Sequence, residues 1–123
     1  MNVWKYFELA KKVASIRDDK RDFLFGAVAI RNDDVLVFNS NGSAVIDKND
    51  RRSYFPTCHA EYRLVRKLDR GAIVFVTRIG GDFSFKNSKP CQTCQNAMRK
   101  RGVKKVYYTI SNDSYGVIIF KKD

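Results

Sequence analysis

The sequence predicts a three-layer α/β/α sandwich around a five-stranded mixed sheet. Two observations lead to this fold class. Segments whose apolar residues have helical spacing alternate with short apolar runs, and Gly, Pro, Asn or Asp residues separate them. Helices that alternate with buried strands are typical of layered α/β folds. The chain has 123 residues, which suits a single domain over 1–123 and leaves little room for a second.

The first part of the chain predicts one helix and a β-hairpin. Residues 4–16 place apolar side chains at helical spacing, with lysines and a glutamate on the other face. The apolar runs 24–31 and 35–39 predict two strands. A short turn signal of three polar residues, 32–34, joins them, so the strands should pair antiparallel. The polar stretch 41–57 predicts a loop.

The second part predicts two more helices and three more strands. Residues 58–69 and 91–101 have helical patterns, and Gly71 and Gly102 end them. Residues 72–78 predict a strand, and 80–89 predict a loop. The last two strands, 103–110 and 115–120, are joined by only a few residues. A parallel pair needs a crossover of about a dozen residues or more, so these strands should form an antiparallel terminal hairpin.

Composition excludes several classes of protein. No apolar run reaches the roughly 18 residues of a membrane helix, and the N-terminus lacks the layout of a secretory signal. We therefore expect a cytoplasmic protein with no membrane partner. The three cysteines are an odd number, and two of them form a Cys-x-x-Cys pair, which favours a metal or a redox pair over a structural disulfide. The net charge of +11 favours polyanionic partners such as nucleic acid or nucleotide phosphates, or else reflects a merely soluble basic surface.

Residues that suit a metal lie at the starts of two predicted helices. His59 begins helix 58–69, and Cys91 and Cys94 begin helix 91–101. Each helix follows a strand and a loop, so both N-termini should lie at the same edge of the sheet. Three protein ligands leave the fourth tetrahedral position of Zn²⁺ to water, which is the catalytic pattern, and zinc lowers the pKa of that water toward neutrality. Glu61, two residues after His59, can reach the water and move its proton.

This pattern, His-x-Glu followed by Pro-Cys-x-x-Cys, is the signature of zinc-dependent nucleobase deaminases. The chain resembles the cytidine deaminase superfamily, which includes cytidine, deoxycytidylate and tRNA adenosine deaminases. The resemblance covers residues 25–108 and is strongest at 58–61, 89–94 and 102–108. It implies a cytidine deaminase-like fold, a Zn²⁺ cofactor and a homo-oligomer. It also implies hydrolytic deamination of a cytosine-type base in a free pyrimidine nucleotide or nucleoside, in which hydroxide attacks C4 and Glu61 shuttles protons.

The resemblance also suggests substrate contacts. The backbone N–H of Ala60 would face the carbonyl edge of the base, Asn41 would contact the sugar or base, and Phe25 and Phe55 would stack on the base. Each has an alternative: Asn41 is also a plausible turn residue with Asn39 as a second candidate, and both phenylalanines suit the core. Cys58 reads as a small buried residue, or as an alternative ligand beside His59.

Other substrates and other activities also fit the sequence. The His-Ala-Glu and Pro-Cys-x-x-Cys motifs look most like deoxycytidylate and tRNA adenosine deaminases, whereas the terminal hairpin looks like the cytidine deaminase branch. A polynucleotide deaminase acting on single-stranded DNA or RNA would use the +11 charge, with the loop 41–57 as its groove. The lysines and arginines at 63, 66, 67, 99, 100, 101, 104 and 105 fit such a footprint or a solvated helix face. A Cys-x-x-Cys redox site and a zinc-stabilised module without activity complete the alternatives.

Overall fold

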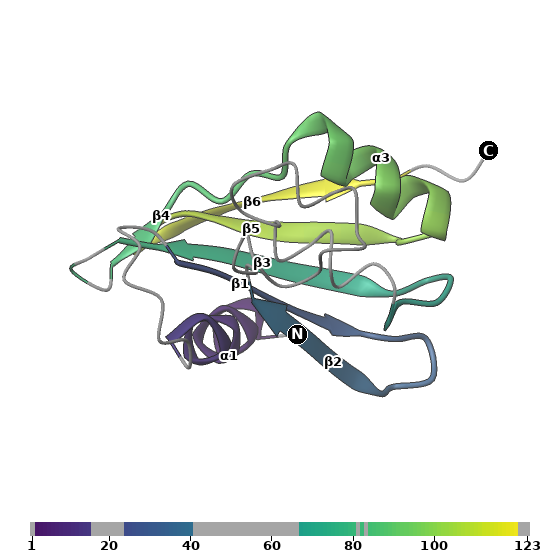
Figure 1. Cartoon of the computed structure of the whole chain (residues 1–123), viewed down its shortest axis with the longest axis horizontal. Coiled ribbons are helices and arrows are strands. Elements are labelled where there is room, and N and C mark those ends of the chain that lie inside the picture. Colours follow the sequence, from purple (N-terminus) through teal and green to yellow (C-terminus); the bar gives the residue numbers. More distant parts are fainter. Residues whose placement is uncertain (1, 16–23, 41–66, 81, 83, 121–123) are drawn as a thin grey trace, which may run out of the picture.

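The structure is a computed structural model that describes residues 2–15, 24–40, 67–80, 82 and 84–120. In chain order its elements are α1 (Val3–Ser15), β1 (Leu24–Ile30), β2 (Leu36–Ser40), β3 (Ile73–Ile79), β4 (Phe85–Lys86), α3 (Gln92–Arg101), β5 (Lys105–Ser111) and β6 (Ser114–Ile119) (Figure 1). The predicted helices and strands that fall within the described residues begin and end within two residues of these bounds. Residues 58–66 of the predicted middle helix lie outside them.

The strands form one mixed sheet in the order β2-β1-β3-β5-β6. The pairs β1–β2 and β5–β6 are antiparallel, which confirms both predicted hairpins. The pair β3–β5 is parallel, and α3 lies in the connection between these two strands. The carboxyl ends of β3 and β5 therefore meet at one end of the sheet, where α3 begins. We call this end the α3-start end.

The structure corrects one detail of the prediction. The segment 80–89 contains a two-residue strand, β4, which pairs antiparallel with the end of β3. Phe85 is buried there against the aromatic rings of Trp4 and Phe7, so an apolar contact holds this short strand in place. The burial pattern of two residues is too short to produce a period that sequence analysis can recognise.

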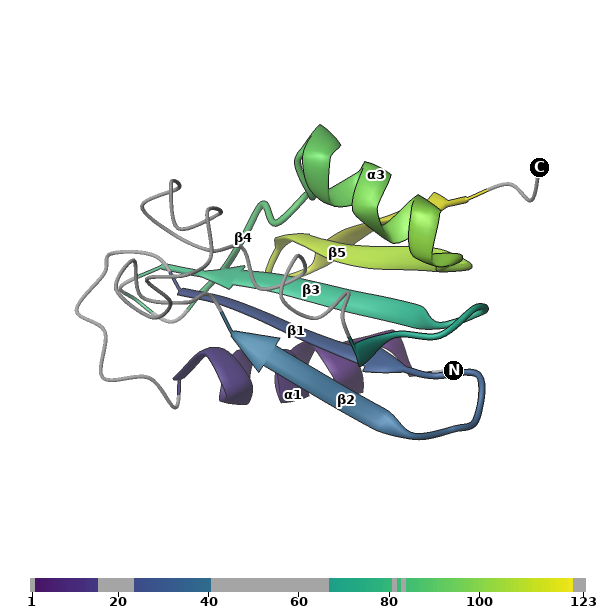
Figure 2. The same cartoon turned by 45° about the vertical axis from the view of Figure 1, so that its right-hand side comes forward.

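Helices cover both faces of the sheet, which confirms the three-layer α/β/α fold (Figure 2). On one face α1 packs through Phe7, Ala10 and Val13 against a cluster that includes Val28 and Phe75. On the other face, α3 packs through its buried side chains against β1, β3 and β5. This second cluster includes Ala27, Ala29, Val74, Val76, Cys94, Met98 and Val106. No helix of the described residues is long and apolar enough to cross a membrane.

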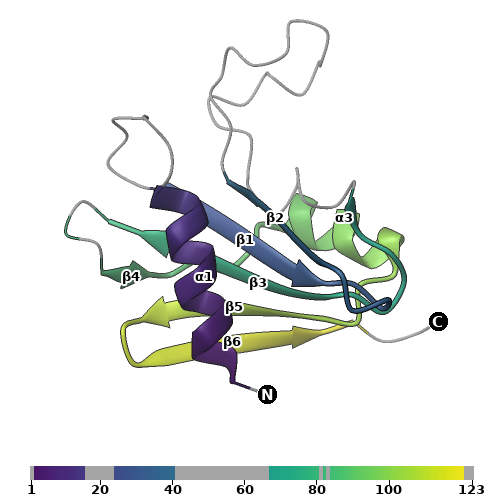
Figure 3. The same ribbon diagram turned by 90° about the horizontal axis from the view of Figure 1, so that it is seen from below.

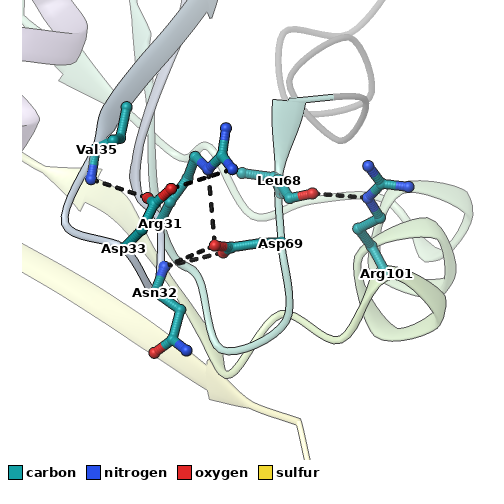
Figure 4. Close-up of polar contacts among 7 residues, drawn as sticks. All are labelled: Arg31, Asn32, Asp33, Val35, Leu68, Asp69 and Arg101. Carbon is teal, nitrogen blue, oxygen red and sulfur yellow. Dashed lines mark hydrogen bonds and ion pairs between the residues drawn. The ribbon is translucent and has the colours of Figure 1, made fainter.

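The end of the sheet opposite the α3-start end is tied together by polar contacts (Figure 4). The Asp69 carboxylate accepts the Asn32 N–H at 2.9 Å and lies 3.7 Å from the Arg31 guanidinium. Arg101, in the last turn of α3, donates from Nε to the Leu68 carbonyl at 2.8 Å. Gly102 follows with φ 90°, a left-handed conformation that suits glycine, and ends α3 where the sequence predicts. Among the described residues, the contacts that fix this end involve none of the predicted site residues Phe25, Cys91 and Cys94.

Candidate metal centre

Two cysteine thiols lie side by side at the start of α3. Cys91 is the N-cap residue with φ −67° and ψ 165°, and its carbonyl accepts the first helical hydrogen bond, from the Gln95 N–H at 3.0 Å. Cys94 is three residues later, on the same side of the helix. Their Sγ atoms are 3.4 Å apart. The structure thus brings together the two predicted cysteine ligands.

The spacing of these sulfurs fits two ligands of one zinc ion. Two thiolates at about 2.3 Å from a tetrahedral Zn²⁺ lie about 3.8 Å apart, close to the observed separation. A disulfide would need about 2.05 Å between the two sulfurs, so the observed separation of 3.4 Å excludes one. The donor set and its geometry are therefore compatible with the predicted metal.

The surroundings of the two thiols differ in a way that suits a site at the protein surface. Cys94 is 2% exposed and belongs to the core cluster under α3, whereas Cys91 is exposed. At the α3-start end of the sheet, one thiol of the pair therefore lies in the core and the other lies at the surface.

A buried pair of hydroxyls fixes the loop that leads into the helix. Ser88, three residues before Cys91, is 3% exposed, and its Oγ lies 3.0 Å from the Val76 carbonyl and 2.9 Å from the Thr109 Oγ1. The Thr109 N–H donates to the Ser88 Oγ at 2.8 Å, and the Ser88 N–H donates to the Thr109 carbonyl at 2.9 Å. The loop is thereby bound to β3 and β5 at once.

Sequence reasoning missed this hydroxyl pair. A serine in a polar loop gives no signal of burial, and the threonine that receives it lies 21 residues away. The two hydroxyls meet only because β3 and β5 lie side by side in the sheet. Beyond Ser88, the Gln95 side chain donates to the Pro90 carbonyl at 2.9 Å, which holds the residue next to Cys91.

The structure also locates one predicted substrate contact. Phe25, near the start of β1, pairs with Arg78 near the end of β3, so it lies at the α3-start end. It is half-buried, packs against the cluster that contains Cys94, and has the Arg78 guanidinium 5.7 Å from its ring centre. Phe25 thus packs against the same core cluster as Cys94 and lies at the same end of the sheet. Its stacking on a base stays a prediction.

The remaining predicted site residues are Asn41, Phe55, Cys58, His59, Ala60 and Glu61, and all lie outside the described residues. Asn39, the second asparagine candidate, is opposite Ala27 in the β1–β2 pair. The predicted convergence of His59 with the two thiols therefore stays a prediction.

Asp82, in the connection from β3 to β4, is excluded as a general acid at neutral pH. The Ser84 hydroxyl and N–H both donate to its carboxylate, at 2.6 and 3.1 Å, and lower its pKa below the ordinary value. Asp82 is therefore ionised at neutral pH, where it holds its turn closed and pairs with Lys86 at 3.9 Å.

Comparisons with solved structures support this fold. The chain is similar to a cytidine deaminase from Burkholderia pseudomallei, with a TM-score of 0.68 and 17% identity over 97% of this chain and 93% of that one. It is similar to a cytidine deaminase from Mycobacterium leprae, with a TM-score of 0.61 and 14% identity over 95% of this chain and 93% of that one. It is also similar to the dCMP deaminase from the cyanophage S-TIM5 in apo form, with a TM-score of 0.60 and 22% identity over 90% and 84%. At these identities the likeness concerns the fold.

A comparison of the sequence with models of protein families shows the family of this chain. No curated protein matches the chain by sequence. The model of the cytidine and deoxycytidylate deaminase zinc-binding region matches residues 2–110, which is most of the 123-residue chain. With a cytidine deaminase fold and paired thiols at the start of α3, the chain belongs to this zinc-binding deaminase family.

Proposed function

We propose that this chain is a zinc-dependent hydrolase that removes the amino group from a cytosine-type base in a free nucleotide or nucleoside. Membership of the family implies hydrolytic deamination. The observation that supports the site is the pair of Cys91 and Cys94 thiols, 3.4 Å apart at the start of α3. We also propose that residues 1–123 form one deaminase domain.

Three side chains would hold the metal in this proposal. Cys91 and Cys94 supply two thiolates, and His59 supplies an imidazole nitrogen. Zinc at such a site lowers the pKa of water toward neutrality and so supplies hydroxide at physiological pH. The Ser88–Thr109 hydroxyl pair keeps the loop before Cys91 from shifting, which preserves the spacing of the two thiols.

Glu61 would carry the protons of the reaction. Its carboxylate would take one proton from the attacking water and pass it to the ring nitrogen of the base. It would then take the second proton, from the hydroxyl added at C4, and pass it to the leaving amine, which departs as ammonia. The Ala60 N–H would donate to the carbonyl edge of the base, and Asn41 would contact the sugar or base. Phe25 and Phe55 would pack against the base plane.

The charge distribution bears on the choice between a free nucleotide and a polymer. The basic last turn of α3, Arg99, Lys100 and Arg101, lies at the opposite end of the helix from Cys91. Ten residues of helix separate these ends by about 15 Å. This basic turn therefore does not line an approach to the thiols, and it gives no support to a polymer as the substrate.

The second candidate is deamination of single-stranded DNA or RNA. The net charge of +11 favours it, because phosphate contacts by lysine and arginine dominate the binding of nucleic acid.

Ammonia release from a panel of substrates tests the proposal. The purified zinc-loaded chain is incubated with cytidine, deoxycytidine, CMP, dCMP and a cytosine-containing single-stranded oligonucleotide. We expect turnover of at least one free nucleoside or nucleotide. Turnover of the oligonucleotide alone would replace the first candidate with the second.

The proton-transfer role is tested with Glu61→Gln against a matched control, Glu8→Gln, which removes an exposed carboxylate on α1. We expect Glu61→Gln to keep its zinc and to lose about 100- to 10,000-fold in kcat. Glu8→Gln should match the unmodified chain. Full activity in a zinc-loaded Glu61→Gln protein would contradict the role.

A further inference from the structure

Three side chains form a row across the sheet at the α3-start end. Phe25 of β1 is opposite Arg78 of β3, and Arg78 is opposite Lys86 of β4. Figure 3 shows β4 beside the end of β3. Paired residues of antiparallel strands point to the same face of a sheet. Because Phe25 packs against the cluster that contains Cys94, the whole row lies on the face that α3 covers.

Arg78 and Lys86, which we call the cation pair, place two positive charges directly opposite each other. Like charges in such positions repel each other and destabilise a sheet. Asp82 relieves this repulsion only in part, because its carboxylate lies 3.9 Å from the Lys86 Nζ in a pair that solvent screens. Together, Arg78 and the segment 80–89 carry three cations and one carboxylate. This excess of positive charge favours the binding of an anion.

The backbone of Lys86 is fixed by the same contacts that fix the loop before Cys91. The Thr109 hydroxyl donates to the Lys86 carbonyl at 2.9 Å. The Ser88 hydroxyl, two residues further along the chain, lies 2.9 Å from the same Thr109 oxygen. The position of the cation pair and the position of the first thiol are therefore set together by one group of hydrogen bonds.

Arg78 lies close to the thiols without being part of the metal site. Its guanidinium carbon is 5.7 Å from the centre of the Phe25 ring, which is within the range of a cation–π contact. Val76, two residues earlier on the same face, packs in the cluster with Cys94. Two residues of strand extend about 7 Å. Such a placement suits a group that binds the end of a substrate remote from the reacting atom.

The chemistry of the cation pair identifies the anion as a phosphate monoester. A guanidinium binds two phosphate oxygens at once, and an ammonium adds a second point of positive charge. A phosphate monoester carries close to two negative charges at neutral pH, which matches the two cations. A carboxylate or a phosphodiester of nucleic acid carries one negative charge and would leave part of the repulsion in place.

We propose that Arg78 and Lys86 bind the phosphate of a cytosine nucleoside monophosphate, and that this pair makes the site prefer the nucleotide to the nucleoside. The inference rests on the proposed deaminase function. It assigns substrate specificity to two residues that lie outside the His-x-Glu and Pro-Cys-x-x-Cys motifs.

Steady-state kinetics of the zinc-loaded chain on dCMP, CMP and the two corresponding nucleosides test this proposal. We expect kcat/KM to be higher for a monophosphate than for its nucleoside by about 10-fold or more. Arg78→Met should lower kcat/KM for the monophosphate about 30-fold, mainly through KM, because a phosphate contact acts in the ground state and the transition state alike. Lys86→Met should lower it about 5-fold, as expected for a more exposed charge. Turnover of the nucleoside should stay within about 3-fold in both variants.

Two further variants separate phosphate binding from a structural effect. Arg70→Met is the matched control, because Arg70 is an exposed arginine beside Gly102 at the opposite end of the sheet. It should leave both substrates unchanged. Arg78→Lys should recover part of the turnover of the monophosphate, since it restores the charge without the planar fork. Circular dichroism checks that each variant is folded, and Lys86→Met decides the test if Arg78→Met does not fold.

The possible results distinguish this inference from the proposed function. A chain that turns over nucleoside and monophosphate equally well, or equal losses on both substrates in the folded variants, would overturn the phosphate assignment and leave the deaminase function intact. Absence of turnover for every cytosine compound would overturn the proposed function and the inference with it. Turnover of the oligonucleotide alone would also overturn the inference, because it would replace the monophosphate by a polymer.

Discussion

Ser88 is a buried hydroxyl that fixes the loop before Cys91, a proposed zinc ligand that Ser88 itself does not touch. Its Oγ has Val76 and Thr109 as partners, and its main chain is bonded to β5. Buried polar groups are costly unless they are satisfied, so this arrangement holds only while both hydroxyls are present. Two residues separate Ser88 from Cys91, and a displacement of this loop would move the first thiol relative to the second.

We therefore expect Ser88→Ala to lower the free energy of unfolding by about 2 kcal/mol, since it leaves the Thr109 N–H without its acceptor. Zinc affinity should fall about 10-fold, the usual effect of losing a group that supports a metal ligand. Thermal denaturation and competition with a chromophoric chelator measure the two quantities. The control is Ser84→Ala in the same connection, whose hydroxyl is bonded only to the Asp82 carboxylate among the described residues. Unchanged zinc affinity in Ser88→Ala would contradict the positioning role.

The three cysteines make a second prediction at the same scale. Cys91→Ser and Cys94→Ser should each abolish stoichiometric zinc binding, because each removes one of three proposed ligands. Cys58→Ser should retain one zinc per chain if His59 is the ligand beside it. Metal analysis after dialysis gives the stoichiometry. Loss of zinc in Cys58→Ser, with retention in His59→Ala, would assign the third ligand to the sulfur instead.

At the scale of the elements, most of the described secondary structure could be predicted, because local signals carry it. Apolar runs such as Val74 to Val76 are buried strand interiors, and Gly102 ends α3 with the left-handed φ that favours glycine. β4 could not be predicted, since Phe85 is held by rings from α1, nearly 80 residues earlier in the chain. The thiol pair could be predicted from spacing alone, whereas the Ser88–Thr109 contact depends on the parallel pairing of β3 and β5.

The packing of α1 on β1 depends on the absence of a side chain at Gly26. A Cβ there would collide with the Ala10 carbonyl, which is helix backbone and cannot move aside. We expect Gly26→Ala to destabilise the protein by about 3 kcal/mol through overpacking. At Gly80 a Cβ would meet side-chain atoms of Lys86 and Asp82, the nearest being the flexible Lys86 Cε at 2.9 Å, so Gly80→Ala should cost less than about 1 kcal/mol. Urea denaturation compares the stability of the two variants. Equal urea midpoints would mean that α1 can move away from β1 without loss of stability.

At the scale of the whole molecule, one group of positive charges lies at the end of the sheet opposite the thiols. The thiols are at the α3-start end, whereas Arg70 and Lys100 are exposed near the other end and make no ion pair within the described residues. Their contribution to an extended nucleic-acid surface is thus separable from their effect on a small substrate. Charges separated by more than about 10 Å of solvent are largely screened at 0.1 M salt.

The double variant Arg70→Gln with Lys100→Gln makes use of this separation. Its kcat/KM for a free cytidine nucleotide should stay within about 2-fold of the unmodified chain, because screening weakens both charges at the active site. Any oligonucleotide binding by the chain should weaken, and the slope of log K against log salt should fall by up to about 1.4, since each phosphate contact to a single strand contributes about 0.7. The two readouts separate the two candidate substrates. A parallel loss of turnover on the free nucleotide would mean that the far end of the sheet does act on the substrate, and would favour the polymer as the molecule that connects both ends.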